Sequence, residues 1–349
     1  MKIPNRYKVL GPPKVGGFGQ VTMCKDEVLD RTVVVKQILH PMHISRIIDE
    51  VVALQEAKSR HVVEIYDVLV SDTGEELSIV EEFLSGEDLS SFDFDSTNPT
   101  DLLKALFQIA TGLRDMHARD VVHRDIKPDN MKFDSEGYIR IFDFGLAKTA
   151  SLPAATKSLS GTPGYMAPEL FSSSYIDKPV DIYAFGALIF RLVSKAVPPN
   201  ARPWPQPPVP LLPHQGIENF GFDNPRLSPL VNACLSFDPG SRPTAELLSK
   251  TFERELLYGQ HRATLVSGPN VFTLNQIAKP VAASHQGNSI QIIYDGIDFV
   301  VTATSGDAFV NNLKAHVGMI LPDSAIITLG SAGARRFVPF DVSHPEVRI

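Results

Sequence analysis

The sequence predicts an α+β chain in which a strand-rich segment precedes a helical segment, and a smaller α+β module follows both. Three observations predict this organisation. Short runs of β-branched and aromatic residues fill the first eighty positions, apolar residues take a helical period from about residue 100, and they alternate again after about residue 258. At 349 residues the chain is also too long for one ordinary domain.

Composition and charge exclude several classes of protein. Hydrophobic residues make up 43% of the chain, which is enough to build a core and excludes disorder as the main state. The 33 Lys and Arg against 40 Asp and Glu give a net charge of −7, so we expect no nucleic-acid partner. Two cysteines, Cys24 and Cys234, exclude a disulfide scaffold. Because no secretory signal and no apolar run of about twenty residues is visible, we expect a cytoplasmic protein that does not enter a membrane.

The first eighty residues predict several short strands and one helix. The strand candidates, each rich in β-branched or aromatic residues, are Tyr7–Leu10, Val21–Met23, Thr32–Val35, Val62–Tyr66 and Leu77–Val80. Between the third and fourth of them, residues 44–57 place Ile47, Val51 and Leu54 at helical spacing.

Two longer helices are predicted further along the chain. Thr100 is the expected N-cap of the first, whose apolar residues recur on one face from Leu103 to Leu113. Residues 181–194 are apolar nearly all round, which predicts a buried helix. Eight prolines between Pro198 and Pro213 then predict an extended loop.

A glycine cluster, Gly16-Gly17-Phe18-Gly19, lies between the first two strand candidates. Such glycines allow backbone N–H groups to approach phosphate oxygens closely, although a plain turn has the same composition. Lys36 ends an apolar strand, where its ammonium could face a phosphate. Glu50, on the predicted helix, is the candidate carboxylate partner of Lys36.

The strongest chemical signal is the segment 122–130. It holds Asp125, Lys127 and Asn130 in one short loop, and Asp143-Phe144-Gly145 follows. Phosphoryl transfer needs metal ions on the phosphates, a carboxylate directed at the incoming hydroxyl, and cations for the developing charge. Asn130 and Asp143 are the hard oxygen ligands that Mg²⁺ takes. Asp125 can accept the hydroxyl proton, and Lys127 can neutralise the transferred group.

On these motifs, which occur in family order over residues 7–257, the chain resembles the eukaryotic-type (Hanks-type) Ser/Thr protein kinase family. The resemblance implies a bilobal kinase domain over residues 1–258, with a β-rich N-lobe (1–81), a hinge (82–86) and a helical C-lobe (87–258). It also implies ATP and Mg²⁺ as cofactors, protein substrates phosphorylated on Ser or Thr, and autophosphorylation on the activation loop.

The resemblance further assigns roles residue by residue. Catalysis would fall to Asp125, Lys127, Lys36 and Glu50, and metal binding to Asn130 and Asp143. Contacts to ATP would come from Val15, Gly16, Gly17, Phe18, Gly19, Val21, Lys36, Glu82, Leu84, Asn130 and Asp143. Structural support would come from Arg124, Glu169, Asp181 and Arg242, with Glu169 paired to Arg242. The candidate phosphorylation sites, in order of preference, are Thr156, then Ser158 and Ser160, with Thr162 as a further hydroxyl.

Three positions depart from the family pattern. Lys14 stands where the first glycine of the loop usually lies, and Val34 replaces the common alanine before Lys36. Glu81 falls at the gatekeeper position, where an apolar or hydroxyl residue is usual. A buried carboxylate there needs a partner or water, since an unpaired buried charge costs several kcal/mol.

Two alternatives to an active protein kinase remain open. A pseudokinase would keep the fold and act as a scaffold or regulatory binding protein, but such proteins usually lack one of the core residues, all of which are present here. A small-molecule kinase of the aminoglycoside type would lack the activation segment that ends in Ala167-Pro168-Glu169.

No kinase motif covers the residues after a predicted linker at 259–285. Residues 286–349 suggest a ββαββ module that resembles a ubiquitin-like β-grasp in its pattern. Two strands around Asp295-Gly296 form the expected hairpin, Ser305 caps an expected helix that carries Phe309 and Leu313, and two strands follow at 325–329 and 336–340. We expect this module to bind a protein partner, and a passive cap on the kinase is the alternative.

Overall fold

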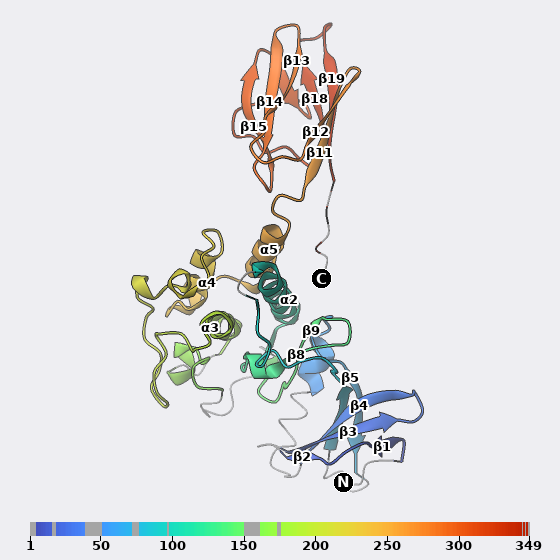
Figure 1. The fold of residues 1–349 in the computed structure, drawn as a ribbon, viewed down its shortest axis with the longest axis vertical. Coiled ribbons are helices and arrows are strands. Elements are labelled where there is room, and N and C mark those ends of the chain that lie inside the picture. Colours follow the sequence, from blue (N-terminus) through green and yellow to red (C-terminus); the bar gives the residue numbers. More distant parts are fainter. Residues whose placement is uncertain are drawn as a thin grey trace. The chain divides into compact units, whose positions relative to one another are not determined.

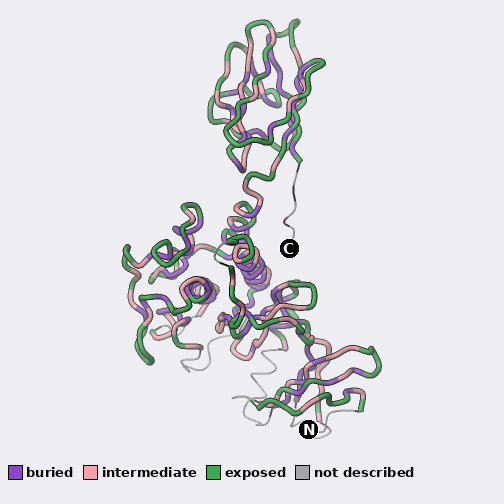
Figure 2. The backbone as a smooth tube through the Cα atoms, viewed as in Figure 1, coloured by how far each residue is buried: buried purple, intermediate pink, exposed green. Residues whose placement is uncertain are grey.

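The computed structural model describes residues 5–15, 19–38, 51–71, 77–95, 98–149, 161–172 and 176–343, with residues 345 and 347. The chain forms two compact units, Met1–Phe252 and Glu253–Arg348 (Figure 1). Each unit has a hydrophobic core of its own, visible as the buried stretches in Figure 2. None of the described helices is both long and apolar enough to cross a membrane.

The first unit begins with an antiparallel sheet. Its strands are β1 (Tyr7–Val9), β2 (Lys14–Val15), β3 (Gly19–Asp26), β4 (Arg31–Ile38), β5 (Ile65–Val70) and β6 (Leu77–Glu82). They follow the order β1-β3-β4-β6-β5, with β2 paired to β3. One face packs a small core around Cys24, Val33 and Val35. The predicted strands are confirmed, except that the candidate at Val62–Tyr66 begins only at Ile65.

The helical part of the first unit is built on α2 (Pro99–His117), α3 (Pro179–Ser194), α4 (Ser228–Cys234) and most of α5 (Ala245–Leu256), whose last four residues belong to the second unit. The α3 helix is buried along nearly its whole length, as its apolar sequence predicts (Figure 2). The predicted N-cap of α2 is wrong by two residues, because Pro99 takes the first helical position and Asn98 accepts a hydrogen bond from the Thr100 N–H. Of the predicted helix at 44–57, residues 51–57 fall in the described part, and 51–56 of these are helical.

The described residues between α2 and α3 contain four short strands. They are β7 (Val121–Val122), β8 (Met131–Phe133), β9 (Ile139–Ile141) and β10 (Lys148–Thr149). The β8 and β9 strands form a hairpin, and β7 pairs with β10. The loop from β7 to β8 and the residues after β9 carry the side chains to which the sequence analysis assigns catalysis and metal binding.

The second unit is an all-β sandwich of two antiparallel sheets (Figure 1). Its strands are β11 (Arg262–Ser267), β12 (Asn270–Leu274), β13 (Val281–His285), β14 (Asn288–Tyr294), β15 (Phe299–Ser305), β16 (Ala308–Val310), β17 (Leu313–Lys314), β18 (Ser324–Leu329) and β19 (Arg336–Ser343). One sheet has the order β12-β11-β19-β18-β16-β17 and the other β13-β14-β15. The predicted hairpin around Asp295-Gly296 is confirmed as β14–β15.

Two predictions for this unit are wrong. Residues 259–285 are not a linker, because β11, β12 and β13 lie within them. The expected helix after Ser305 is replaced by β16 and β17, so the ββαββ order of a β-grasp does not hold. The helix does not form because the chain makes a tight turn here, where Asn311 and Asn312 both have positive φ angles, of 47° and 67°. Two consecutive residues with positive φ are typical of a two-residue hairpin loop, and asparagine tolerates this conformation.

Candidate active site

Three polar side chains, two from the loop between β7 and β8 and one from Thr162, surround the carboxylate of Asp125. Lys127 Nζ donates to Asp125 Oδ2 at 2.7 Å, and the Thr162 hydroxyl donates to Oδ1 at 2.7 Å. Lys127 Nζ also donates to the Thr162 oxygen at 2.7 Å, which closes a triangle of three side chains. From the other side, Asn130 Nδ2 donates to Asp125 Oδ2 at 3.0 Å. This geometry fixes the direction in which the Asp125 carboxylate points.

The shape of the loop depends on Asp181, which is fully buried at the start of α3. Its two oxygens accept hydrogen bonds from the backbone N–H groups of His123 and Arg124, each at 2.8 Å. Arg124 has a φ of 69°, a strained value for a side chain of this kind, and the bond to Asp181 holds it there. His117 Nε2 lies 3.0 Å from Asp181 Oδ2. Burial alone would raise the pKa of Asp181, but the bond to His117 and the nearby His123 outweigh it and hold the pKa below its ordinary value.

Asp143 follows β9 and faces the ammonium of Lys36 on β4, with Lys36 Nζ 3.2 Å from Asp143 Oδ1. Burial alone would raise the pKa of Asp143, but the charge and hydrogen bond of Lys36 outweigh burial and keep it below its ordinary value. The Asp143 side chain is 43% exposed, so the ionised carboxylate can also meet a ligand from solution. Its φ of 63° is a second strained backbone position in this site.

Asn130 and Asp143 fit the requirements of a magnesium ion. Asn130 donates from its amide nitrogen to the Asp125 carbonyl and to the Asp125 carboxylate. The amide oxygen, which is the atom that Mg²⁺ would take, is not used by either bond. Asp143 offers an ionised carboxylate oxygen of the same hard character. Metal binding by Asn130 and Asp143 stays a prediction.

The predicted ion pair between Glu169 and Arg242 forms with two parallel hydrogen bonds, at 2.7 and 2.8 Å. The Arg242 side chain is 0% exposed, and its remaining N–H groups reach the carbonyls of Ser236 and Pro179. Each of the three nitrogens of this buried guanidinium therefore donates at least one hydrogen bond. The pair ties the segment after residue 161 to the loop before α5.

The residues expected to contact the nucleotide base lie on β2, β3 and the segment after β6. Val15 and Val21 are exposed on β2 and β3, and Leu84 is buried. Glu82 ends β6, and its side chain forms an ion pair with Arg140 at 3.5 Å. Glu81, at the gatekeeper position, is buried opposite Val34 in the β4–β6 register.

Several predicted site residues lie outside the described residues. These are Gly16, Gly17, Phe18, Glu50, Thr156, Ser158 and Ser160. Their assigned roles stay predictions.

Two features of the site were missed by the sequence reasoning. His117, which bonds to Asp181, stands at the end of α2 and has no local motif. Thr162 was considered only as a phosphorylation site, whereas its hydroxyl bridges Asp125 and Lys127. In the sequence, this bridging role of Thr162 is indicated only by the position of its hydroxyl directly before Pro163-Gly164.

A family model describing the protein kinase domain matches residues 7–252 of the chain. The chain is 29% identical over 269 residues to the probable serine/threonine-protein kinase nek2 of Dictyostelium discoideum, an alignment covering 71% of this chain and 63% of the relative. It is 31% identical over 215 residues to serine/threonine-protein kinase pkn2 of Myxococcus xanthus, covering 56% of this chain and 25% of the relative.

A third relative is serine/threonine-protein kinase ppk34 of Schizosaccharomyces pombe, which is 30% identical over 232 residues. That alignment covers 64% of this chain and 65% of the relative. The chain therefore spans between 25% and 65% of the length of these three relatives.

Proposed function

The chain belongs to the serine/threonine protein kinase family, and from that premise we propose that it transfers the γ-phosphoryl group of MgATP to serine or threonine hydroxyls of proteins. The observation that carries this proposal is the arrangement of Lys127 and Thr162 around Asp125, together with the pairing of Lys36 and Asp143. These contacts support a site in which Asp125 is the general base, Lys36 the cation for the phosphates and Asp143 a metal ligand.

Asp125 is the group that accepts the proton of the incoming hydroxyl. Its Oδ2 is held by Lys127 and Asn130, while Oδ1 accepts one hydrogen bond from Thr162. A carboxylate oxygen can accept two hydrogen bonds, so Oδ1 keeps a place for a substrate hydroxyl. Lys127 is fixed beside the same carboxylate, where its ammonium can neutralise charge on the group being transferred.

Asn130 and Asp143 would hold Mg²⁺, and Lys36 would hold phosphate oxygens of ATP. When bound, Mg²⁺ supplies positive charge that neutralises the phosphate oxygens. The lowered pKa of Asp143 supports this role, because the carboxylate is ionised and ready to bind a cation. The 3.2 Å distance from Lys36 Nζ to Asp143 Oδ1 supports both roles, because a phosphate-binding cation and a metal ligand have to lie near each other.

The direct test is incubation of the full chain with labelled ATP and Mg²⁺ beside an Asp125→Asn variant. Asn keeps the shape of the side chain but removes the base, and a positioned base contributes roughly 10²- to 10⁴-fold to the rate. We expect the variant to fold and to lose self-labelling and transfer to an added protein. Equal labelling of the variant and the wild type would exclude the proposed reaction.

Autophosphorylation is part of the proposal. The segment 149–160 offers Thr156, Ser158 and Ser160 as acceptors, and a phosphate there would meet Arg124 through charge-assisted hydrogen bonds. Mass spectrometry of the wild-type and Asp125→Asn proteins tests it. Phosphate in this segment of the wild type alone supports self-modification, and its absence from active wild-type protein contradicts it.

A further inference from the structure

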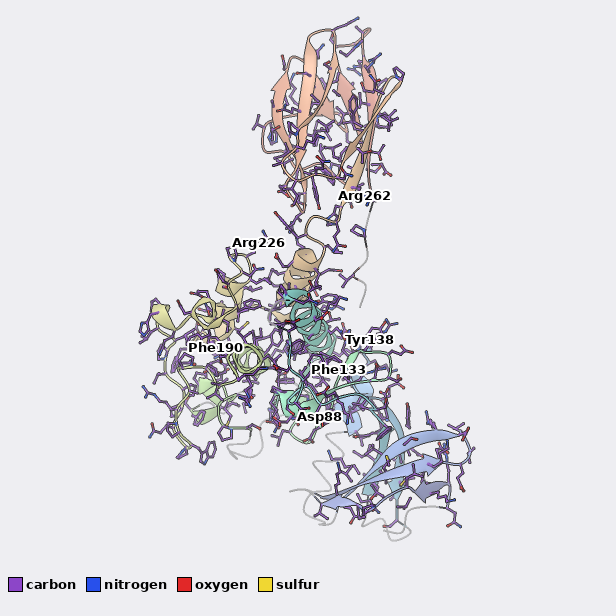
Figure 3. All side chains as sticks on the ribbon, in the orientation of Figure 1. Asp88, Phe133, Tyr138, Phe190, Arg226 and Arg262 are labelled. Carbon is purple, nitrogen blue, oxygen red and sulfur yellow. The ribbon has the colours of Figure 1, made fainter. Side chains whose placement is uncertain are left out.

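The β8–β9 hairpin is hydrogen-bonded to the chain on both sides of β5 and β6, the two strands that precede the predicted hinge (Figure 3, near Phe133 and Tyr138). On the side of β8, Gly86 N donates to Phe133 O at 3.0 Å, and Leu89 N donates to Met131 O at 3.0 Å. On the side of β9, Val63 N donates to Ile141 O at 3.0 Å. The hairpin therefore contacts the chain both before β5 and after β6.

The same hairpin carries the two candidate metal ligands. Asn130 directly precedes β8, and Asp143 follows the end of β9 by two residues. Phe142 N also donates to Asn130 O at 3.0 Å, which locks the two ends of the hairpin together. A shift of the hairpin would therefore move both Asn130 and Asp143.

One guanidinium links this hairpin to the first hinge residue. Arg140 lies in β9, and its side chain is only 14% exposed. Its Nε donates to Asp134 Oδ2 at 3.0 Å, its Nη2 lies 3.5 Å from Glu82 Oε1, and its Nη1 donates to Val62 O at 3.5 Å. A planar guanidinium can serve three such acceptors at once, which a lysine ammonium on a flexible stem cannot do in the same geometry.

Both carboxylates that Arg140 meets are themselves fixed. Asp134 Oδ1 accepts hydrogen bonds from the N–H groups of Glu136 and Tyr138, each at 2.9 Å, within the hairpin turn. Glu82 Oε2 accepts from Glu64 N at 3.3 Å, and the Glu82 side chain is 16% exposed. Arg140 thus connects two anchored groups rather than two mobile surface chains.

We propose that Arg140 is a positioning residue that couples ATP binding to Mg²⁺ binding, because it holds the hinge residue Glu82 to the hairpin that carries Asn130 and Asp143. This inference rests on the proposed function. The backbone around Glu82 is where the purine would bind, and the hairpin is where the metal would bind. A fixed link between them makes the presence of one ligand favour the geometry needed by the other.

The test measures the Kd of ATP for the full chain by calorimetry, once with EDTA and once with excess Mg²⁺. The ratio of the two values reports the coupling. Arg140→Lys keeps the positive charge but loses the planar guanidinium, and Glu82→Gln keeps the shape of the side chain but loses its charge. In each variant we expect the ratio of the two Kd values to fall about 5-fold, which is at the lower end of the coupling found between two binding sites. The double variant should fall no further than either single variant, since both changes break the same link.

Lys132→Gln is the matched control. Lys132 stands directly opposite Arg140 in the hairpin, and its ion pair with Asp88, at 3.6 Å, is partly exposed (27% and 54%). We expect its ratio to equal that of the wild type. A loss of thermal stability in Arg140→Lys or Glu82→Gln with an unchanged ratio would overturn the inference, because it would make the cluster purely structural. Should Arg140→Lys fail to fold, the ratio in Glu82→Gln decides alone. A wild type that binds no ATP would overturn the proposed function itself, and this inference with it.

Discussion

Thr162 and Asp125 are joined by a 2.7 Å hydrogen bond across 37 residues of sequence, with the threonine hydroxyl donating to Oδ1. The same hydroxyl accepts from Lys127. The geometry of the proposed base therefore depends on where the segment that begins at residue 161 is placed. If the Thr162 hydroxyl is removed or displaced, Asp125 and Lys127 lose the hydrogen-bond partner that they share.

We expect Thr162→Ala to lower the rate of phosphotransfer by about 10- to 100-fold, because a hydrogen bond to a charged group contributes about 1.5–3 kcal/mol and about 1.4 kcal/mol is tenfold in rate. Thr162→Ser keeps the hydroxyl and should retain most of the rate. Steady-state kinetics with a generic protein acceptor measure both variants. Equal rates for Thr162→Ala and wild type would contradict the bridging role, and so would phosphate found on Thr162 in fully active protein.

The catalytic chemistry could be predicted because it is local in sequence. Asp125, Lys127 and Asn130 lie within six positions, and Asp143 follows two residues after β9, the strand that pairs with β8. The roles of Thr162 and Arg140 could not be predicted in this way. Each depends on a partner 35 or more residues away, such as Lys127 for Thr162 and Glu82 for Arg140, and only the tertiary fold brings these groups together.

In the second unit the alternation of apolar residues predicted strands correctly, but a helix was inferred where a turn occurs. Phe309 and Leu313 are four residues apart, which suits a helix face as well as two short strands. The Asn311-Asn312 pair was the deciding local signal, because both residues adopt positive φ. Gln286-Gly287, which joins β13 to β14 directly after the predicted linker, has positive φ at both residues as well.

The Glu169–Arg242 pair should contribute strongly to the stability of the first unit. Removing one partner of a buried ion pair leaves the other charge uncompensated and costs about 3–5 kcal/mol. We expect Glu169→Ala to lower the free energy of unfolding, measured with urea, by roughly this amount. Lys195→Ala is the control, since its pair with Asp93 is exposed on both sides (55% and 83%) and should contribute about 0–1 kcal/mol. Similar losses for the two variants would contradict the argument.

His61 should make the first unit less stable as the pH falls. Burial lowers its pKa to about 4 from an ordinary 6.5, and its Nδ1 lies 3.1 Å from the Ile139 carbonyl. Between these values the unfolded chain binds a proton that the folded chain does not, so stability is full above pH 6.5 and is lost as the pH falls toward 4. The loss should reach about 3 kcal/mol.

Urea unfolding at about pH 7.5 and about pH 5 tests the effect of His61, with His61→Gln as the comparison. Gln keeps a donor for the Ile139 carbonyl but does not titrate, so we expect a smaller difference between the two pH values in the variant. An equal difference in the variant and the wild type would assign the pH dependence to other groups.

Deletion of residues 262–349 should leave the basal ATP chemistry in place, because the proposed catalytic and metal-binding residues all lie in the first unit, which has its own core. The sandwich it removes has a separate core, built around Ile290, Tyr294 and Phe340. We expect the 1–261 fragment to label itself at a rate close to that of the full chain, while its choice of protein acceptor or its response to a partner changes. Labelling assays and a comparison of phosphorylated proteins in a lysate measure the two effects. An insoluble or inactive fragment would show instead that the first unit needs the sandwich, and an identical acceptor profile would make the sandwich a passive cap.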